Sequence, residues 1–291
     1  MKKVAAIGTF DGVHRGHRSV LDTLVDVGLR NNLLPVAITF SNHPLSLIDP
    51  SRLPRTLTPT GKKVKLLEQA GVKPLVLEFD EELRSKKADE WLGILHDKFD
   101  VETLVIGYDS TFGSDGVNLS MNDYRQLAEK NGINLVVAPE LKNVSSSAIR
   151  KAVGNGEMEK AAEMLGRTYS LRGKVEKGNS LGHTIGFPTA NVKPDPDIAI
   201  PASGVYAARV KAPDGKVYPA MVNIGTRPTV KRGNDIVIEA HLIGWEGDLY
   251  GKQISIRFVK RLRDEKQFGS IEELKEQLRH DKEEVTDLLG K

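Results

Sequence analysis

The chain has 291 residues, which is long enough for two domains and a sizeable core. Its 42 basic and 39 acidic side chains leave a net charge of +3, too balanced to indicate a nucleic-acid partner, and its 8 Phe, 6 Tyr and 2 Trp form no stacking array. The absence of cysteine excludes disulfides, thiolate zinc sites and a cysteine nucleophile, and no apolar run is long enough to span a membrane, so we expect a cytoplasmic protein without membrane contact.

The first motif lies at residues 8–17, GTFDGVHRGH, between an apolar run over 4–7 and a helical pattern over 17–29. Strand, glycine-containing loop and helix in this order are typical of a phosphate site, because glycine permits a tight turn and a helix N-terminus offers free N–H groups. His14 and His17 would add two imidazoles to these donors and so help to receive a nucleotide's negative charge. The alternative is two surface histidines that flank a tight turn.

Apolar runs and helical patterns alternate through the first half of the chain. The apolar runs lie at 4–10, 35–40, 74–79, 103–107 and 134–138, and the helical patterns near 17–29, 60–71, 87–98 and 120–131. This alternation predicts a doubly wound parallel sheet, in which ligands bind beyond the carboxyl ends of the strands. We therefore expect the loops after Phe10, Phe40 and Ile106 to share one crevice.

Polar residues follow two later strands of this expected sheet. Asn42, His43 and Pro44 come after the second strand, and the segment 107–113, GYDSTFG, comes after the fourth. Because it falls on the expected ligand side, His43 is a third candidate histidine. The alternative is a loop histidine with an ordinary hydrogen bond.

A serine cluster precedes the next helical pattern. Ser145, Ser146 and Ser147 stand at an expected helix start, with Arg150 one turn later. Hydroxyls, free N–H groups and a guanidinium all favour oxyanions, so this pattern indicates a phosphate site. A serine N-cap beside a surface arginine is the alternative.

The second half of the chain changes to a strand pattern. Strands are expected at 170–177, 204–210, 217–224, 236–243 and 254–259, with no long helical pattern between them, and a capped helix begins at 270–273. Successive strands without crossovers predict an antiparallel barrel or sandwich. We expect a domain over 1–153, a helical linker over 154–169 and a barrel domain over 170–291.

Polar residues gather beside prolines and glycines in this second domain. They occupy 186–191 (GFPTAN), 223–229 (NIGTRPT), Glu239 and 247–251 (GDLYG), where the mouth of a barrel would hold a ligand. Turn signals and a solvated Glu239 are the alternatives. The sequence contains neither a G-x-x-x-x-G-K-[S/T] loop nor a G-x-G-x-x-G fingerprint, so it supports neither a P-loop kinase nor a dinucleotide-binding dehydrogenase.

Both halves resemble the prokaryotic bifunctional riboflavin kinase/FAD synthetases. In the first half the likeness is carried by 8–17, 42–44, 107–109, 112–113 and 144–150, and in the second by 186–191, 204–206, 223–229, Glu239 and 263–268. The resemblance implies an N-terminal doubly wound nucleotidyltransferase domain and a Greek-key flavokinase barrel with a C-terminal helix. The barrel would transfer the γ-phosphate of ATP to riboflavin, and the first domain would transfer AMP from a second ATP to the resulting FMN, giving FAD and pyrophosphate.

The resemblance also implies a role for each matching residue. The catalytic residues would be Glu239, as the kinase base, with His14 and His17 in adenylyl transfer. In the adenylyl domain ATP would contact Gly8, Phe10, Asp11, Gly107, Asp109, Ser145, Ser146, Ser147 and Arg150, and FMN would contact Asn42, His43 and Phe112. In the kinase, ATP and flavin would contact Gly182, His183, Gly186, Pro188, Tyr206, Asn223, Arg263 and Phe268, and Mg²⁺ would bind at Thr189 and Asn191.

Several positions depart from the family pattern. Ser110 and Thr111 replace an aromatic–Arg pair, Gly116 and Asn118 replace an Arg and a Gly, Ser147 replaces a Thr, and His183 replaces an Arg. The first two changes remove two cations near the expected FMN phosphate. Besides the bifunctional enzyme, two hypotheses therefore stay open: an enzyme with only one activity, and a non-catalytic flavin or nucleotide sensor. Self-association is a further possibility that the sequence does not decide.

Overall fold

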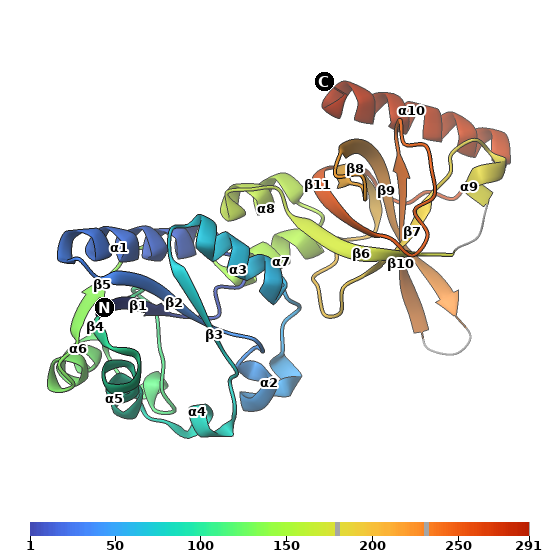
Figure 1. Cartoon of the computed structure of the whole chain (residues 1–291). Helices are drawn as coiled ribbons and strands as arrows, with labels where there is room; N and C mark the ends of the chain where they lie inside the picture. Colours follow the sequence, from blue (N-terminus) through green and yellow to red (C-terminus); the bar gives the residue numbers. More distant parts are fainter. Residues whose placement is uncertain (178–180, 230–232, 291) are drawn as a thin grey trace. The chain divides into compact units, whose positions relative to one another are not determined.

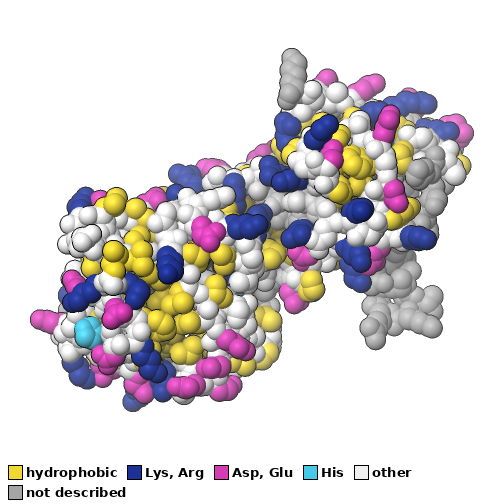
Figure 2. Space-filling model, in the orientation of Figure 1, with side chains coloured by type: hydrophobic (Ala, Val, Ile, Leu, Met, Phe, Trp, Pro, Cys, Tyr) yellow, Lys and Arg dark blue, Asp and Glu magenta, His cyan; other side chains and the backbone are white. Residues whose placement is uncertain are grey.

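The computed structural model describes residues 1–177, 181–229 and 233–290 (Figure 1). The chain forms two compact units, Met1–Ser146 and Ser147–Lys291. None of the described helices has the length and apolarity that crossing a bilayer demands. On the face shown in Figure 2, Lys and Arg are interspersed with Asp and Glu over the described residues of each unit, in keeping with the balanced composition.

The first unit is built on a five-stranded parallel sheet in the order β3-β2-β1-β4-β5. Its strands are β1 (Lys3–Ile7), β2 (Leu34–Phe40), β3 (Lys73–Leu77), β4 (Val101–Ile106) and β5 (Asn134–Val137). The helices are α1 (Arg15–Asn31), α2 (Leu45–Ile48), α3 (Thr60–Gln69), α4 (Glu81–Ser85), α5 (Ala88–Phe99) and α6 (Met121–Lys130), with short 3₁₀ turns η1 (Pro50–Arg52) and η2 (Gly116–Asn118).

Both faces of this sheet are covered by helices, as a doubly wound fold requires. Strand side chains alternate between the faces, so Val4 packs with Leu21 and Leu67 from α1 and α3, while Ala5 packs with Leu92 and residues of α6 on the other side. Figure 1 shows α1 and α3 on one face and α5 and α6 on the other. The strand order reverses between β1 and β4, and the loops after these two strands open at that point.

The second unit is a closed antiparallel barrel in the order β10-β7-β6-β11-β8-β9. Its strands are β6 (Ser170–Glu176), β7 (Ala190–Pro194), β8 (Gly204–Lys211), β9 (Val217–Thr229), β10 (Gly233–Leu242) and β11 (Gln253–Arg263). Strands β8, β9 and β10 follow one another as hairpins and β11 returns beside β8, which makes a Greek key. The expected fold class, a doubly wound sheet followed by a Greek-key barrel with a final helix, is confirmed.

Four helices accompany the barrel in sequence: α7 (Ser146–Gly154), α8 (Met158–Leu165), the short α9 (Leu181–Thr184) and α10 (Ile271–Leu289). The Ser270 hydroxyl accepts the Glu273 N–H and caps α10. The expected division into 1–153, 154–169 and 170–291 stays a prediction.

Strand alternation decides which side chains of the barrel meet α10. On β10, Ile238 and Ala240 are buried in the barrel. Glu239 and His241 alternate with them along the strand and therefore point to the opposite face. Met221 of β9 belongs to that opposite face and packs with Val285 and Leu289 of α10. Helix α10 therefore covers the outer face of the wall that carries Glu239.

Candidate functional site

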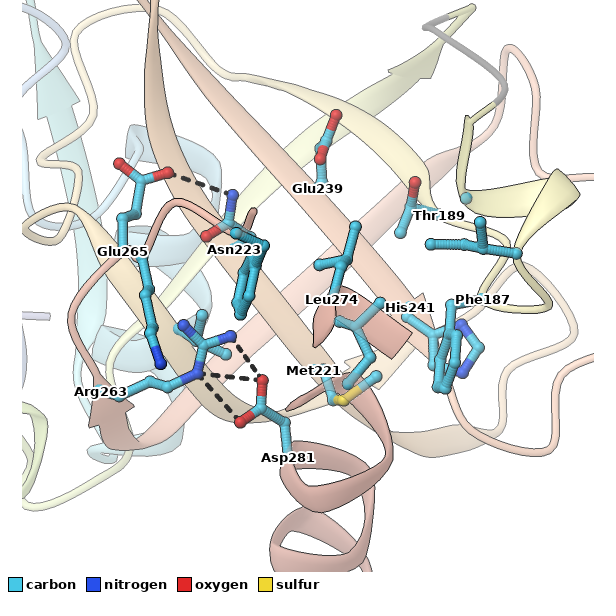
Figure 3. Close-up of a pocket in the computed structure, with 16 residues that line it drawn as sticks. Phe187, Thr189, Met221, Asn223, Glu239, His241, Arg263, Glu265, Leu274 and Asp281 are labelled. Carbon is cyan, nitrogen blue, oxygen red and sulfur yellow. Dashed lines mark hydrogen bonds and ion pairs between the residues drawn. The ribbon is translucent and has the colours of Figure 1, made fainter. Parts of the chain in front are cut away.

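A cavity of about 390 Å³ lies beneath α10, on the outer face of the barrel wall (Figure 3). Its lining comes from the segment before β7, from β8 to β10, from residues 263–268 and from α10. It includes Gly182, Phe187, Thr189, Met221, Asn223, Glu239, His241, Arg263, Glu265, Phe268, Leu274, Leu278 and Asp281. The polar residues of β9 and β10 that line this cavity point outward from the wall, and the expectation of a ligand at the barrel mouth stays a prediction.

Glu239 stands in a row of polar side chains that crosses three strands. The register pairs it directly with Asn191 of β7 and Asn223 of β9, so the three side chains share one face. Thr189, immediately before β7, lines the same cavity, and Figure 3 shows Glu239 between Asn223 and Thr189. Glu239 is half-buried in the cavity wall, which argues against the alternative of a fully solvated carboxylate.

A tight loop holds Thr189 at the cavity. The Phe187 N–H donates to the Gly182 carbonyl at 2.8 Å, and a Cβ on Gly182 would lie 2.4 Å from the Phe187 oxygen, so only glycine fits at 182. His241 Nδ1–H donates to the Pro188 carbonyl at 2.8 Å, and its ring meets Phe187 edge-on. Burial lowers the pKa of His241 and so favours the neutral imidazole, although the bond to the Pro188 carbonyl acts in the opposite direction.

A buried ion pair joins α10 to the end of β11. Arg263 donates from Nε to both Asp281 oxygens at 3.0 and 3.1 Å and from Nη2 to one of them at 2.7 Å. Gln277 donates to the same carboxylate, which is 1% exposed. Arg263 was predicted to contact the flavin or ATP, but its partner Asp281 was not, and together they fasten the helix that closes the cavity.

The segment 264–268 forms another side of the cavity. Glu265 accepts the Asn223 amide at 3.4 Å and lies over Gly225, where a Cβ would come within 2.2 Å of its oxygen. The Phe268 ring lies 6.0 Å from the Arg263 guanidinium. Glycine at 225 thus lets this segment approach β9.

A second cavity, of about 530 Å³, shares Thr189 with the first. Pro188 and Thr189 line it together with Trp245, Leu249 and Tyr250. The sequence singled out 247–251 as a segment that would hold a ligand, with a turn signal as the alternative, but it did not predict that Trp245 would join this segment in a cavity wall. Thr189 is therefore the residue at which the two cavities meet.

In the first unit, the loop 8–17 forms a compact cap on α1. Gly8 ends β1 by donating to the Ile38 carbonyl at 3.0 Å. His14 Nδ1 accepts the His17 N–H at 3.2 Å, and the two rings stack with centroids 3.6 Å apart. Phe10 meets the His17 ring edge-on, and Phe10 and Val13 have φ of 46° and 39°, an uncommon conformation that the surrounding contacts hold. The structure thus brings the two histidines together at a helix N-terminus.

Asp11 fastens this loop to the rest of the unit. Its buried carboxylate accepts the N–H groups of Leu57 and Thr58 at 3.0 Å, and its backbone carbonyl accepts the Ser146 hydroxyl at 2.8 Å. Asp11 was predicted to contact ATP, whereas the contacts seen here are structural. They also bring Ser146, and Ser145 before it, next to the histidine loop.

The predicted FMN residues have structural bonds in this structure. The Asn42 amide pairs with the backbone of Phe79, donating to its carbonyl and accepting its N–H at 2.8 Å each. His43 Nδ1 accepts the Leu45 N–H at 3.1 Å at the start of α2. The Phe112 backbone bonds to the Tyr124 hydroxyl, against which its ring packs.

The departures from the family pattern have a packing reason at two positions. Ser110 Oγ accepts the Gly107 N–H at 3.0 Å and so closes the loop after β4, while Asp109 beside it is exposed. At Gly116 a Cβ would lie 2.7 Å from the Tyr124 hydroxyl, so an arginine does not fit there without movement of Tyr124. Nothing in the structure explains Thr111 or Asn118.

Some predicted residues are not brought to these sites. Tyr206 is completely buried, donates its hydroxyl to the Ala202 carbonyl and packs on Phe258, because strand parity turns it to the face opposite the cavity. Ser147 and Arg150 belong to the second unit, so their grouping with the histidine loop stays a prediction. Gly186 adopts φ of 84° in the exposed turn before Pro188, and the His183 side chain lies outside the described residues.

In the part of the chain that the structure describes, no three His, Asp or Glu side chains gather into a metal site. The hydroxyl of Thr189, the amide of Asn191 and the carboxylate of Glu239 are instead a small set of oxygen donors. Such a set fits Mg²⁺, which takes few protein ligands and binds mostly water and substrate phosphates.

Comparison with known proteins assigns both units. Residues 1–151 match the family described as FAD synthetase, and residues 165–289 match the family described as riboflavin kinase. A bifunctional riboflavin kinase/FMN adenylyltransferase of Bacillus subtilis is 36% identical over 98% of this chain and 92% of the relative. One of Escherichia coli is 34% identical over 99% of this chain and 93% of the relative. The chain belongs to the bifunctional riboflavin kinase/FMN adenylyltransferase family.

This membership confirms the expected function, a transferase with riboflavin kinase and FMN adenylyltransferase activities. A solved structure from Streptococcus pneumoniae, described as a macrolide-efflux protein, has the same fold, with a TM-score of 0.88, 28% identity and coverage of 97% of this chain and 93% of that one.

Replacing Asp281 with Asn tests the ion pair that fastens α10. The guanidinium of Arg263 would lose its anionic partner, and we expect the free energy of unfolding of the kinase unit to fall by about 3 kcal/mol, the low end for such a loss because Arg263 keeps some exposure. Denaturant unfolding would measure the change in stability. Riboflavin kinase kinetics would show a raised KM for riboflavin. Asp287→Asn, on an exposed position of the same helix, is the matched control, and equal behaviour of the two variants would contradict the prediction.

Proposed function

We propose that riboflavin phosphorylation takes place where the two cavities of the barrel unit meet. The supporting observation is Thr189, which lines both of them. The cavity beneath α10 has apolar walls from Phe187, Met221 and Leu278 that suit the flavin ring, and the other has aromatic walls that suit adenine. The γ-phosphate of ATP would then lie beside Thr189 and Glu239.

Glu239 acts as the general base of this reaction. Its carboxylate accepts the proton of the riboflavin 5′-hydroxyl as that oxygen attacks the γ-phosphorus, and ADP leaves. Thr189 and Asn191 hold Mg²⁺, which neutralises phosphate charge when bound. His241 keeps the Pro188–Thr189 backbone in place through its bond to the Pro188 carbonyl.

Adenylyl transfer takes place at the histidine loop of the first unit. An FMN phosphate oxygen attacks the α-phosphorus of ATP and pyrophosphate leaves, so no protein nucleophile is required. His14, His17 and the N-terminal N–H groups of α1 stabilise the charge that develops. Ser146, whose hydroxyl donates to the Asp11 carbonyl, borders this loop. Within the same unit Ser145, Gly107 and Asp109 complete the ATP contacts, and the ATP roles of Ser147 and Arg150 rest on the family resemblance alone.

One assay tests both reactions and the alternatives. Purified protein is incubated with ATP, Mg²⁺ and either riboflavin or FMN, and the flavins are separated by chromatography. FAD from both substrates supports the bifunctional enzyme. FMN accumulation without FAD would establish a kinase that has lost adenylyl transfer through changes such as Gly116, and no turnover beyond one flavin per chain would indicate a sensor.

Replacing Glu239 with Gln keeps the side-chain shape and removes the proton acceptor. We expect FMN formation to fall by about 10²–10⁴-fold, while FAD formation from supplied FMN persists. Initial rates of the two steps measure this, with the exposed Glu276→Gln of α10 as control. An unchanged kinase rate would show that Glu239 is not the base.

Replacing His17 with Ala removes a donor from the adenylyl site. We expect FMN-to-FAD conversion to fall by about 10²–10³-fold, with riboflavin phosphorylation retained, because the kinase has its own nucleotide cavity. His96→Ala, a half-exposed histidine of α5 in the same unit, is the control. Equal losses in both steps would point to misfolding or to one shared ATP site.

A further inference from the structure

Lys63 is a buried cation that neither reaction has so far used. It lies in α3, is 6% exposed and donates from Nζ to two backbone carbonyls, Thr9 O at 3.0 Å and Phe40 O at 2.9 Å. Lysine is rarely buried unless it is paired. Here the partners in hydrogen-bond contact are carbonyl oxygens, and the Asp11 carboxylate acts on the ammonium electrostatically.

The two carbonyls belong to two different loops of the adenylyl unit. Thr9 follows β1 and begins the loop that carries His14 and His17. Phe40 ends β2 and precedes Asn42 and His43. A single ammonium group therefore sets the distance between the two loops, and the Thr39 hydroxyl adds a second donor to Thr9 O at 3.1 Å.

The chain just before Lys63 makes a second contact with the histidine loop, and here the loop supplies the charged group. Leu57 and Thr58, which lead into α3, donate their N–H groups to the Asp11 carboxylate. The start of the segment 57–63 therefore binds the Asp11 carboxylate of the loop through backbone N–H groups, and the end of the segment binds the Thr9 carbonyl of the loop through the Lys63 ammonium. Phe10 and Val13, the two residues with positive φ, lie in the loop that these two contacts hold.

Keeping this charge buried lowers stability. Burial lowers the pKa of Lys63 to about 8, partly opposed by the negative charge of Asp11. The unfolded chain, with the ordinary value of 10.5, binds more protons between these two pH values. The contribution of Lys63 to the free energy of unfolding therefore rises as pH rises from about 8 to about 10.5, and at neutral pH the charged side chain is unfavourable for folding.

We propose that Lys63 is a positioning residue for adenylyl transfer, and that its cation holds the histidine loop and the Asn42–His43 loop at their working distance. This rests on the assignment of His14 and His17 to that reaction. Lys63 touches neither substrate in this scheme. Its loss therefore acts on the alignment of the reacting groups, where small misplacements lower kcat by about 10²-fold, more than on substrate affinity.

Two substitutions at Lys63 test the inference. Lys63→Met removes charge and donors, and Lys63→Gln removes the charge but keeps N–H donors for the carbonyls. For both we expect kcat of FMN adenylylation to fall by about 10²-fold with KM values changed by less than about threefold, and riboflavin phosphorylation to be unchanged. Lys65→Met, at an exposed position of the same helix, is the matched control and should behave as the unsubstituted chain.

The pH dependence of kcat gives a readout that a purely structural lysine would not move, whereas the pH dependence of stability reports only that Lys63 is buried. Asp11 is the charged group that acts on Lys63 in this pH series. In the unsubstituted chain we expect kcat of adenylylation to fall above about pH 8, while the Lys63 contribution to stability rises. In Lys63→Gln both trends should be absent, as measured by initial rates and by denaturant unfolding at each pH.

The possible results separate clearly. Full kcat in folded Lys63→Met or in Lys63→Gln overturns the inference, since the cation would then be unnecessary. Unfolding of both variants below the assay temperature also overturns it, because Lys63 would then be needed only for the fold. If His17→Ala leaves FAD formation intact, the site assignment itself is wrong, whereas a loss in His17→Ala without a loss at Lys63 contradicts only the present inference.

Discussion

The alternation of side chains along a β-strand is the constraint on which the kinase half of the molecule depends. Ile238 and Ala240 fill the barrel, so Glu239 and His241 must face outward, where a carboxylate would normally be solvated. It becomes part of a cavity because α10 lies over the same face and the Arg263–Asp281 pair fastens the helix there. The barrel therefore supplies a rigid wall, and the cavity forms between that wall and α10.

The adenylyl half obtains its site by a different route. A parallel sheet places the carboxyl ends of β1, β2 and β4 along one edge, but it leaves the loops after them free to vary. Charged and polar groups on the neighbouring segments limit that freedom: the Asp11 carboxylate binds backbone N–H groups, and the Asn42 amide pairs with the backbone of Phe79. Polar side chains that look like ligand contacts in the sequence can thus serve to hold the loops that carry those contacts.

This difference explains what could be predicted from the sequence. Hydrophobic periodicity predicted the doubly wound sheet, and the change to strand patterns left an antiparallel barrel or sandwich, between which the family resemblance decided. Motifs singled out Glu239, Thr189 and the two histidines. Tyr206 was misplaced because a motif does not reveal strand parity, and the neighbouring Val205 lines the cavity instead. Asp281 and Lys63 were missed because each is one of several like charges on an amphipathic helix, and only the tertiary contacts distinguish the buried one. The second cavity needed Trp245 and Tyr250 to be brought beside Pro188, which no local pattern indicates.

The loop after β4 shows how a departure from a family pattern can be structural. Ser110 closes this loop on Gly107, and Tyr124 occupies the space beside Gly116 while bonding to the Phe112 backbone. The loop is therefore shaped by neutral hydrogen bonds at the positions where relatives of the family would have cations. An FMN phosphate bound there would meet N–H and hydroxyl donors, each of which gives less stabilisation to an anion than a charge-assisted bond does. Under the site assignment proposed above, more of the charge on the reacting phosphates would then be stabilised by the histidines and by the N-terminus of α1, and adenylyl transfer would depend on the position of the histidine loop.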